Sequence, residues 1–289
     1  MAAAADKRVF DAHFHVGAFG AQRIAGRVVR PIAPQREQPG ACSEYLDRYG
    51  LAGGLIVPTY LDDETAAFRY NRLLMQELAG DDRLIGGLWV SPLEHLWKLC
   101  EAALKILPHP RIRALKIASN TWPRRYSIDP DTWDQKVRWR MERILDVAEQ
   151  HHLVIHCHTG YLPGAEPLAF DSFLQEFGHR ARFQLVHMGE TIAPVFAFVP
   201  RFVDWVQCGL RVYTDTSIVP GFGPPWLLEE LDRYNLGYDR VLFATDTPWG
   251  RYPSERAKLD IPGLPGEVLD AMLWSNAANL YRLEAPSQE

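Results

Sequence analysis

Two histidines stand two positions apart near the start of the chain, in the stretch FDAHFH (residues 10–15). On a β-strand, residues i and i+2 point to the same face, so the imidazoles of His13 and His15 would project together while Phe14 faces the other way. Two imidazoles on one face can be the first ligands of a metal ion. Because short His-x-His strings also arise by chance on ordinary strands, the metal interpretation requires further ligands elsewhere in the chain.

Three later segments supply candidate ligands: IHCH (residues 155–158), LVH (185–187) and FATD (243–246). Histidines together with one carboxylate suit Zn²⁺ and related divalent ions, and a catalytic site also keeps one position open for water or substrate. In the first of these segments His156 and His158 share a face, so either could reach the ion. We favour His158, because it ends its segment and lies 29 residues before His187.

These residues need a scaffold that brings distant segments together, and the hydrophobic pattern predicts one. Short β-rich runs alternate with longer helical patterns, which is typical of βα units around a parallel sheet. Eight such units predict one α/β domain over residues 1–289, a (β/α)₈ TIM barrel with its active site at the C-terminal ends of the strands. We expect strands near residues 9–15, 54–58, 84–90, 112–118, 153–158, 182–187, 211–216 and 240–246, and helices that include 64–79, 94–106, 132–151, 195–208 and 265–282.

The composition limits the classes of partner. A net charge of −5 and a pI near 6.1 give no broad basic surface for nucleic acid. No stretch approaches about 18 uninterrupted apolar residues, so no membrane span is predicted. We expect a cytoplasmic protein with a small-molecule substrate. The sequence leaves its oligomeric state open, with a homodimer as one alternative. The four cysteines are scattered without a Cys-x-x-Cys pair, as in proteins with reduced thiols: Cys42, Cys100, Cys157 and Cys208.

The order of the motifs resembles the amidohydrolase superfamily, and most closely its amidohydrolase-2 branch, which includes aminocarboxymuconate-semialdehyde-decarboxylase-like enzymes. The resemblance covers nearly the whole chain. It implies one divalent metal held by His13, His15, His158 and Asp246, with His187 beside it. The motifs that carry it are FDAHFHVG (10–17), ALKIAS (114–119), IHCHTG (155–160), LVHMGE (185–190), VLFATDTPWG (241–250) and SNAANLYRL (275–283).

The roles at such a site follow from general metal chemistry. Zinc is the expected ion, with Mn²⁺ and Fe²⁺ as alternatives. A metal lowers the pKa of bound water to about 7 and polarises a substrate carbonyl. Asp246 would accept the proton of that water, and His187 would hydrogen-bond the substrate oxygen or donate a proton to a leaving group. Two structural alternatives remain open, a helix N-cap for Asp246 in TDTPWG and an internal hydrogen bond for His187.

Lys116 has two interpretations. In binuclear members of the superfamily, such as phosphotriesterase-like enzymes, a carboxylated lysine on strand 4 bridges two metals. The segment FATDTPW (243–249) resembles the mononuclear branch instead, in which Lys116 would contact an anionic substrate. Five other histidines fall in predicted helices or connections and are expected to be surface or structural residues: His95, His109, His151, His152 and His179.

Substrate recognition would come from the loops at the same end of the barrel. The longest, from about residue 16 to 43, contains four arginines among Gly and Pro and is a candidate lid or an ordinary surface loop. Aromatic walls and arginines suit a planar or unsaturated anionic substrate, because guanidinium pairs with carboxylate. The arginines of the long loop are Arg23, Arg27, Arg30 and Arg36, and the further candidates for substrate binding are Lys116, Trp122, Arg124, Arg125 and Trp249.

Three functions agree with these residues. The first is a metal-dependent hydrolase that uses metal-activated water on an amide, lactone or ester-like bond of a small organic substrate. The second is a metal-dependent nonoxidative decarboxylase of an unsaturated or aromatic carboxylic acid. The third is a non-catalytic binding protein with a degenerate barrel site. Carbon dioxide release against water incorporation separates the first two, and metal content separates both from the third.

Overall fold

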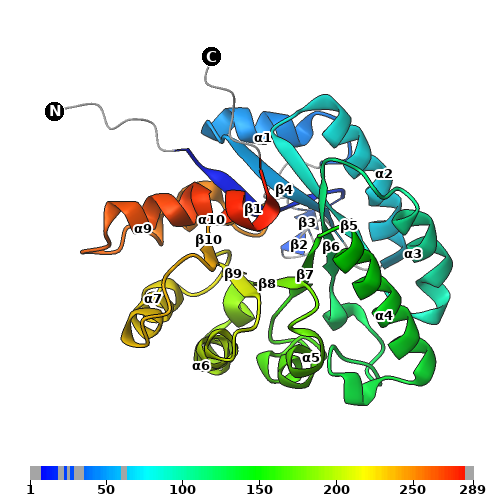
Figure 1. Cartoon of the computed structure of the whole chain (residues 1–289). Helices are drawn as coiled ribbons and strands as arrows, with labels where there is room; N and C mark the ends of the chain where they lie inside the picture. Colours follow the sequence, from blue (N-terminus) through cyan, green and yellow to red (C-terminus); the bar gives the residue numbers. More distant parts are fainter. Residues whose placement is uncertain (1–7, 19–22, 25–26, 29–35, 60–63, 284–289) are drawn as a thin grey trace.

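Eight parallel strands follow one another around a barrel, with helices outside them (Figure 1). The computed structural model describes residues 8–18, 23–24, 27–28, 36–59 and 64–283. Neighbouring strands in the sheet follow the order of the chain, so each βα unit packs beside the previous one. The strands are β1 (Phe10–Val16), β4 (Gly53–Pro58), β5 (Leu84–Trp89), β6 (Ile112–Ile117), β7 (Val154–His158), β8 (Arg182–Val186), β9 (Val212–Asp215) and β10 (Val241–Leu242).

The first and last strands close the barrel. The backbone N–H of Asp246 donates to the carbonyl of His13 at 2.8 Å, and the N–H of His15 donates to the carbonyl of Thr247 at 3.0 Å. Regular strand geometry in β10 covers only two residues, but these bonds extend its pairing with β1 as far as Thr247. We call this pairing the seam of the barrel. Residues from both ends of the chain meet there.

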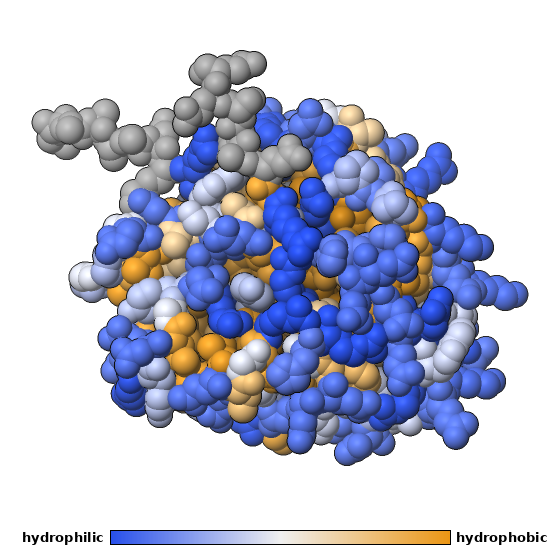
Figure 2. Space-filling view, in the orientation of Figure 1, coloured by the Kyte–Doolittle hydropathy of each residue, from blue (hydrophilic) through white to orange (hydrophobic). Residues whose placement is uncertain are grey.

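The helices bury one face against the barrel. In α4, Val137, Met141 and Ile144 are buried at spacings of three and four residues, and Asp134 caps the first turn by accepting from Val137 N at 2.8 Å. Hydrophilic residues cover much of the outer surface (Figure 2). Among the described helices, none is long and apolar enough to cross a membrane. The helices are α1 (Ala41–Tyr49), α2 (Glu64–Gly80), α3 (Trp97–Leu104), α4 (Gln135–Gln150), α5 (Phe170–Phe177), α6 (Ile192–Gln207), α7 (Gly223–Arg233), α8 (Tyr252–Ala257), α9 (Gly266–Asp270) and α10 (Asn276–Tyr281).

Apolar side chains fill the barrel interior at the N-terminal ends of the strands. Leu280 and Tyr281 of α10 cover this end and pack against the interior side chains. The polar residues of the candidate site lie in the remaining part of the interior, towards the C-terminal ends of the strands. The apolar layer consists of Phe10, Ala12, Leu55, Val57, Ile85, Ala114, Val154, Leu242 and Ala244.

The sequence-based prediction of a (β/α)₈ barrel is confirmed, and each of the eight predicted strands overlaps an observed one. The boundaries differ by one or two residues, except that the predicted strand 240–246 is regular only at Val241–Leu242. The predicted final helix 265–282 is interrupted by a π-helical turn at residues 271–275. Because the interruption widens one turn without reversing the chain, α9 and α10 still form one helical segment.

The long loop of residues 16–43 is only partly described. A short antiparallel pair, β2 (Arg23–Ile24) and β3 (Arg27–Val28), lies within it, and Arg30 and the side chains of Arg23 and Arg27 fall outside the description. Arg36 is buried and donates to the carbonyl of His15 at 3.0 Å, so it ties the loop to the end of β1. The role of this loop as a lid stays a prediction.

Candidate metal centre

A β-bulge in β1 lets both histidines of the first segment face the barrel interior. Phe10 and Ala12 already point inward, so simple alternation would send the next odd-numbered residues outward. The pairing of β1 with β4 shifts register before Phe14, and this bulge reverses the alternation. Phe14 consequently packs in the outer core, while His13 and His15 turn inward together, as the sequence predicted.

The carboxylate of Asp11 holds the bulge in place. Its Oδ1 accepts hydrogen bonds from the backbone N–H of His13 at 3.2 Å and of Thr245 at 2.9 Å. Its Oδ2 accepts from the hydroxyls of Tyr45 at 2.7 Å and Thr245 at 2.6 Å. The side chain is fully buried, and burial raises the pKa of Asp11 to about 7 in spite of these bonds. Asp11 therefore fastens β1 to the segment that carries Asp246.

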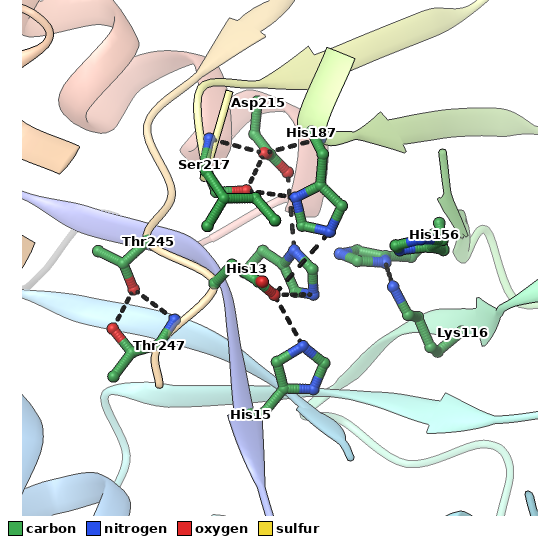
Figure 3. A network of polar contacts seen from close by, with 12 residues as sticks. His13, His15, Lys116, His156, His187, Asp215, Ser217, Thr245 and Thr247 are labelled. Carbon is green, nitrogen blue, oxygen red and sulfur yellow. Dashed lines mark hydrogen bonds and ion pairs between the residues drawn. The ribbon is translucent and has the colours of Figure 1, made fainter. Parts of the chain in front are cut away.

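Three imidazoles approach one oxygen of Asp246. They belong to His13, His15 and His187, which lie close together in Figure 3. The distance to Asp246 Oδ1 is 2.9 Å from His15 Nε2, 3.5 Å from His13 Nε2 and 3.9 Å from His187 Nε2. Among the described residues, His13, His15 and Asp246 form one group of candidate ligands whose donor atoms all lie within 4.8 Å of one another. A second group joins His13 and His187 to Asp215.

The donor atoms of the first group fit a divalent cation. His15 Nδ1 lies 3.3 Å from the carbonyl of Pro58, so a neutral His15 carries its proton there and presents the Nε2 lone pair to Asp246. Both ring nitrogens of His13 are buried and lack a hydrogen-bond partner among the described residues. Nitrogen lone pairs that face a carboxylate oxygen repel it unless a positive charge lies between them. A set of imidazole nitrogens and a carboxylate oxygen suits zinc, manganese or iron.

Burial favours the uncharged form of these groups when no ion is bound. It is the largest cause of the lowered pKa values of His13, His15, His158 and His187, all of which lie well below the usual value. Burial also raises the pKa of Asp246 well above its usual value, and the nearby Lys116 opposes that effect. Neutral imidazole is the form of histidine that ligates metals.

The two histidines of β7 have different surroundings. His156 is fully buried, and its Nδ1 lies 3.2 Å from the ammonium nitrogen of Lys116 (Figure 3). An ammonium only donates, so Nδ1 accepts this bond and a neutral His156 carries its proton on Nε2. His158 instead lines a cavity beside the cluster, with Nε2 at 4.0 Å from Glu190 Oε2. The lone pair of His156 is therefore already used, which favours His158 as the ligand from β7.

A cavity of about 370 Å³ opens beside this cluster. Charged groups in its lining include the ammonium of Lys116 and the carboxylates of Asp246 and Glu190, and apolar or aromatic walls complete it. Burial lowers the pKa of Lys116 to about 8, so its side chain is mainly cationic at neutral pH. The lining residues are His15, Lys116, Asn120, His158, Tyr161, Leu162, His187, Glu190, Ile218, Asp246 and Trp249.

The predicted residues divide between the cavity and other locations. Lys116 and Trp249 line the cavity, whereas Trp122 is buried in the core and Arg124 and Arg125 are exposed outside the lining. The role of the last three in substrate binding stays a prediction. Among the predicted surface histidines, His95, His152 and His179 are exposed and His109 and His151 are partly exposed.

The helix-cap alternative for Asp246 does not agree with the structure. The next helix, α8, begins at Tyr252, and its N-cap position is Arg251. The Asp246 carboxylate faces the histidines instead. For His187 both interpretations hold, because Nδ1 makes an internal bond to Ser217 Oγ at 2.8 Å while Nε2 faces Asp246.

Glu190 was not predicted as a site residue from the sequence, although it lies in the motif LVHMGE. The chain from His187 to Glu190 has four consecutive positive φ angles, 71°, 49°, 90° and 70°. At Gly189 an added Cβ would lie within 3.0 Å of Pro194, so only glycine fits there. This turn brings His187 and Glu190 to the same cavity. Three non-glycine residues in this region store strain, which is typical of functional sites.

The structure is a (β/α)₈ barrel with a cluster of histidines and an aspartate at the C-terminal ends of its strands. This combination of fold and site indicates the class of protein. The amidohydrolase family matches residues 10–283, and the chain belongs to this family of enzymes. Among curated proteins, no sequence matches the chain significantly.

Solved structures share the barrel over the full chain. The 5-carboxyvanillate decarboxylase from Sphingomonas paucimobilis has a TM-score of 0.66 at 16% identity, with 96% of this chain and 100% of that chain covered. The enzyme of the same name from Novosphingobium aromaticivorans, complexed with manganese and a nitrobenzoic acid, has a TM-score of 0.67 at 14% identity, covering 96% and 97%. A probable 2-pyrone-4,6-dicarboxylic acid hydrolase from Acinetobacter baumannii has a TM-score of 0.60 at 14% identity, covering 95% and 99%. These identities show a shared fold.

Proposed function

We propose that this protein is a metal-dependent nonoxidative decarboxylase of an aromatic or unsaturated carboxylic acid. The observation that carries the proposal is the arrangement of the cavity. The ammonium of Lys116 and the imidazole of His187 line the cavity beside the cluster of His13, His15 and Asp246. Apolar residues complete the walls. The similarity to several decarboxylases of aromatic acids supports the choice of reaction.

Each part of the cavity has a task in such a reaction. Lys116 donates to the carboxylate of the substrate and holds it in the cavity. The walls from Leu162, Ile218 and Trp249 exclude water, which favours loss of a charged carboxylate as neutral carbon dioxide. When the bond from the ring carbon to the carboxylate breaks, its electron pair stays on the carbon. His187 takes up a proton at Nε2 from a substrate hydroxyl or water and passes it to that carbon.

We further propose one divalent ion per chain, held by His13, His15, His158 and Asp246. The bound ion supplies Lewis-acid polarisation of substrate oxygens. Zinc is the favoured ion because nitrogen and carboxylate ligands suit it, and the manganese in the Novosphingobium aromaticivorans structure supports that ion as the alternative. The engagement of Lys116 with His156 argues against a carboxylated lysine between two ions.

Hydrolysis of a lactone or ester-like bond is the second candidate. It is favoured by the carboxylate of Asp246 in the cavity, a group that can accept a proton from an attacking water, and by the similarity to the pyrone dicarboxylic acid hydrolase. The same ligands and the same cavity serve both reactions, so the fold does not distinguish them.

A product analysis separates the two. The metal-loaded protein is incubated in ¹⁸O-labelled water with hydroxybenzoic acids, carboxylated vanillic acids, unsaturated acids and pyrone dicarboxylic acids. Decarboxylation releases carbon dioxide and leaves the ring product without the label, whereas hydrolysis places ¹⁸O in the product. Lys116→Gln should raise the Michaelis constant for the acid substrate, and the exposed Lys136→Gln serves as the matched control. A loaded protein that converts none of these acids would contradict both proposals.

A further inference from the structure

A chain of hydrogen bonds supports His187 from the side opposite the cavity (Figure 3). Asp215 ends β9, and Ser217 follows two residues later. Ser217 Oγ lies 2.8 Å from His187 Nδ1 and donates to Asp215 Oδ1 at 2.5 Å. All three side chains are buried.

Asp215 acts only as an acceptor in this chain. Besides Ser217 Oγ, its Oδ1 accepts from the backbone N–H of Ser217 at 3.1 Å and of His187 at 3.3 Å. Its Oδ2 accepts from Gln184 Nε2 at 2.8 Å. Four donors directed at one carboxyl group match an ionised carboxylate, which has acceptor sites for all of them.

The orientation of Gln184 is itself fixed. The hydroxyl of Tyr281, in α10, donates to Gln184 Oε1, and Gln184 Nε2 also lies 3.4 Å from the carbonyl of Ala12. The amide nitrogen therefore has to face Asp215. The chain of bonds thus begins at the helix that covers the N-terminal end of the barrel and ends at the imidazole of His187.

We propose that Asp215 and Ser217 are positioning residues that hold neutral His187 in the tautomer with its proton on Nδ1. The hydroxyl of Ser217 has one proton, and it is donated to Asp215. Ser217 Oγ can then interact with His187 only as an acceptor, so the proton between them belongs to Nδ1. The lone pair of His187 lies on Nε2, which faces the cavity and Asp246 Oδ1 at 3.9 Å.

This tautomer determines the first proton transfer in which His187 can take part. It approaches a substrate as a proton acceptor at Nε2, and it becomes a donor only after it has taken up a proton. Asp215 then stabilises the resulting cation through Ser217. The inference depends on the surroundings of His187 and not on the choice between decarboxylation and hydrolysis.

Nitrogen NMR of the protein labelled with ¹⁵N-histidine tests the tautomer directly, because a protonated and an unprotonated ring nitrogen have widely separated chemical shifts. Spectra are recorded on the purified protein and again after chelation, and the His187 signals are identified by their loss in His187→Gln. We expect a protonated Nδ1 and an unprotonated Nε2. In Ser217→Ala, Nδ1 loses its acceptor, and the signals of the chelated protein should shift towards the Nε2-protonated form that predominates in water.

Two further variants separate positioning from a general structural role. Ser217→Thr keeps the hydroxyl and should restore the wild-type signals. Ser91→Ala removes another fully buried serine hydroxyl, at the end of β5, and should leave them unchanged. A wild-type His187 protonated on Nε2 would overturn the proposal, because it would mean that the direction of the chain is reversed. So would signals that do not move in a folded Ser217→Ala.

Discussion

His15 Nε2 lies 2.9 Å from Asp246 Oδ1, although the two residues are 231 positions apart. Because His15 Nδ1 faces the carbonyl of Pro58, this short contact joins a lone pair to a carboxylate oxygen. Without a proton or a cation such a contact is repulsive. Burial raises the pKa of Asp246 and so favours a proton in this position when no ion is bound. Because His13 and His187 face the same oxygen, we expect a divalent cation to take the place of that proton.

We expect about one tightly bound divalent ion per chain, because the proposed ligands His13, His15, His158 and Asp246 would complete one site without Lys116. Elemental analysis of the purified protein measures the ratio. Chelation should lower the melting temperature, since an ion that binds only the folded state stabilises it by about 2.7 kcal/mol at a hundredfold excess over its dissociation constant. Two ions per chain in an active sample, with a carboxylated Lys116 between them, would contradict the prediction.

Asp246→Asn should separate metal binding from proton transfer. The amide keeps the size of the side chain and one oxygen ligand but has no basic group, so the barrel should stay folded and metal occupancy should fall only in part. Turnover at equal metal loading should fall at least about a hundredfold, the lower limit of general-base assistance. The comparison uses the substrate found by product analysis, with the exposed Asp239→Asn as control. Near-normal turnover would show that Asp246 is no proton acceptor.

The histidines of β7 should differ in their effect on metal content. His158→Ala should reduce both metal content and activity, because it removes a ligand that lines the cavity. His156→Ala should retain the metal, because its lone pair accepts from Lys116. Metal content after dialysis is measured for both variants and for wild type. Loss of the metal in His156→Ala but not in His158→Ala would assign the ligand to His156.

Asp11→Ala should destabilise the fold and the site together. It leaves the backbone N–H of Thr245 without its acceptor and removes one acceptor from the buried hydroxyl of Tyr45, a loss of about 1–3 kcal/mol for a group of this kind. Because the bulge that directs His13 inward depends on the same carboxylate, metal affinity should fall as well. Denaturant unfolding and metal titration measure the two effects. Asp239→Ala is the exposed control, and an Asp11→Ala protein with unchanged metal affinity would show that the bulge forms without this carboxylate.

Substrate binding should weaken as the pH rises through about 8. Burial lowers the pKa of Lys116 to about 8, so its charge is present below that pH and lost above it. The Michaelis constant for a carboxylate substrate should therefore increase above pH 8 in wild type. Lys116→Gln, which has no charge to lose, should show a high Michaelis constant without this step. A step that persists in Lys116→Gln would assign the titration to another group.

Much of the fold and part of the site could be predicted from the sequence. Strand periodicity and the rule that barrel chemistry lies at the C-terminal strand ends were sufficient to bring His13, His15 and Asp246 together. Each of these signals depends on a short stretch of sequence and can still be recognised when a strand boundary is slightly misplaced. The resemblance to the amidohydrolase-2 branch added the expected order of the ligands, and the family match agrees with it.

The rest depended on relations that no local pattern contains. The bulge in β1 reverses the side-chain alternation, and nothing in FDAHFH marks its position, although Asp11 is the residue that stabilises it. The bond between Ser217 and His187 joins side chains that follow two different strands, so it exists only once β8 and β9 are paired. Arg124 and Arg125 follow β6 closely, yet the loop that contains them turns away from the cavity lining.

The seam between β1 and the last strand has a consequence for local unfolding around a bound ion. The proposed ligands His13 and His15 lie on one side of the seam and Asp246 on the other, so an ion held by all three acts as a cross-link between the two ends of the barrel. Opening of the seam costs the backbone bonds between these segments, and with an ion in place it would also cost bonds from the ion to its ligands. A bound ion should therefore slow local unfolding at the seam, and hydrogen exchange at the backbone amides of His15 and Asp246 should become faster after chelation.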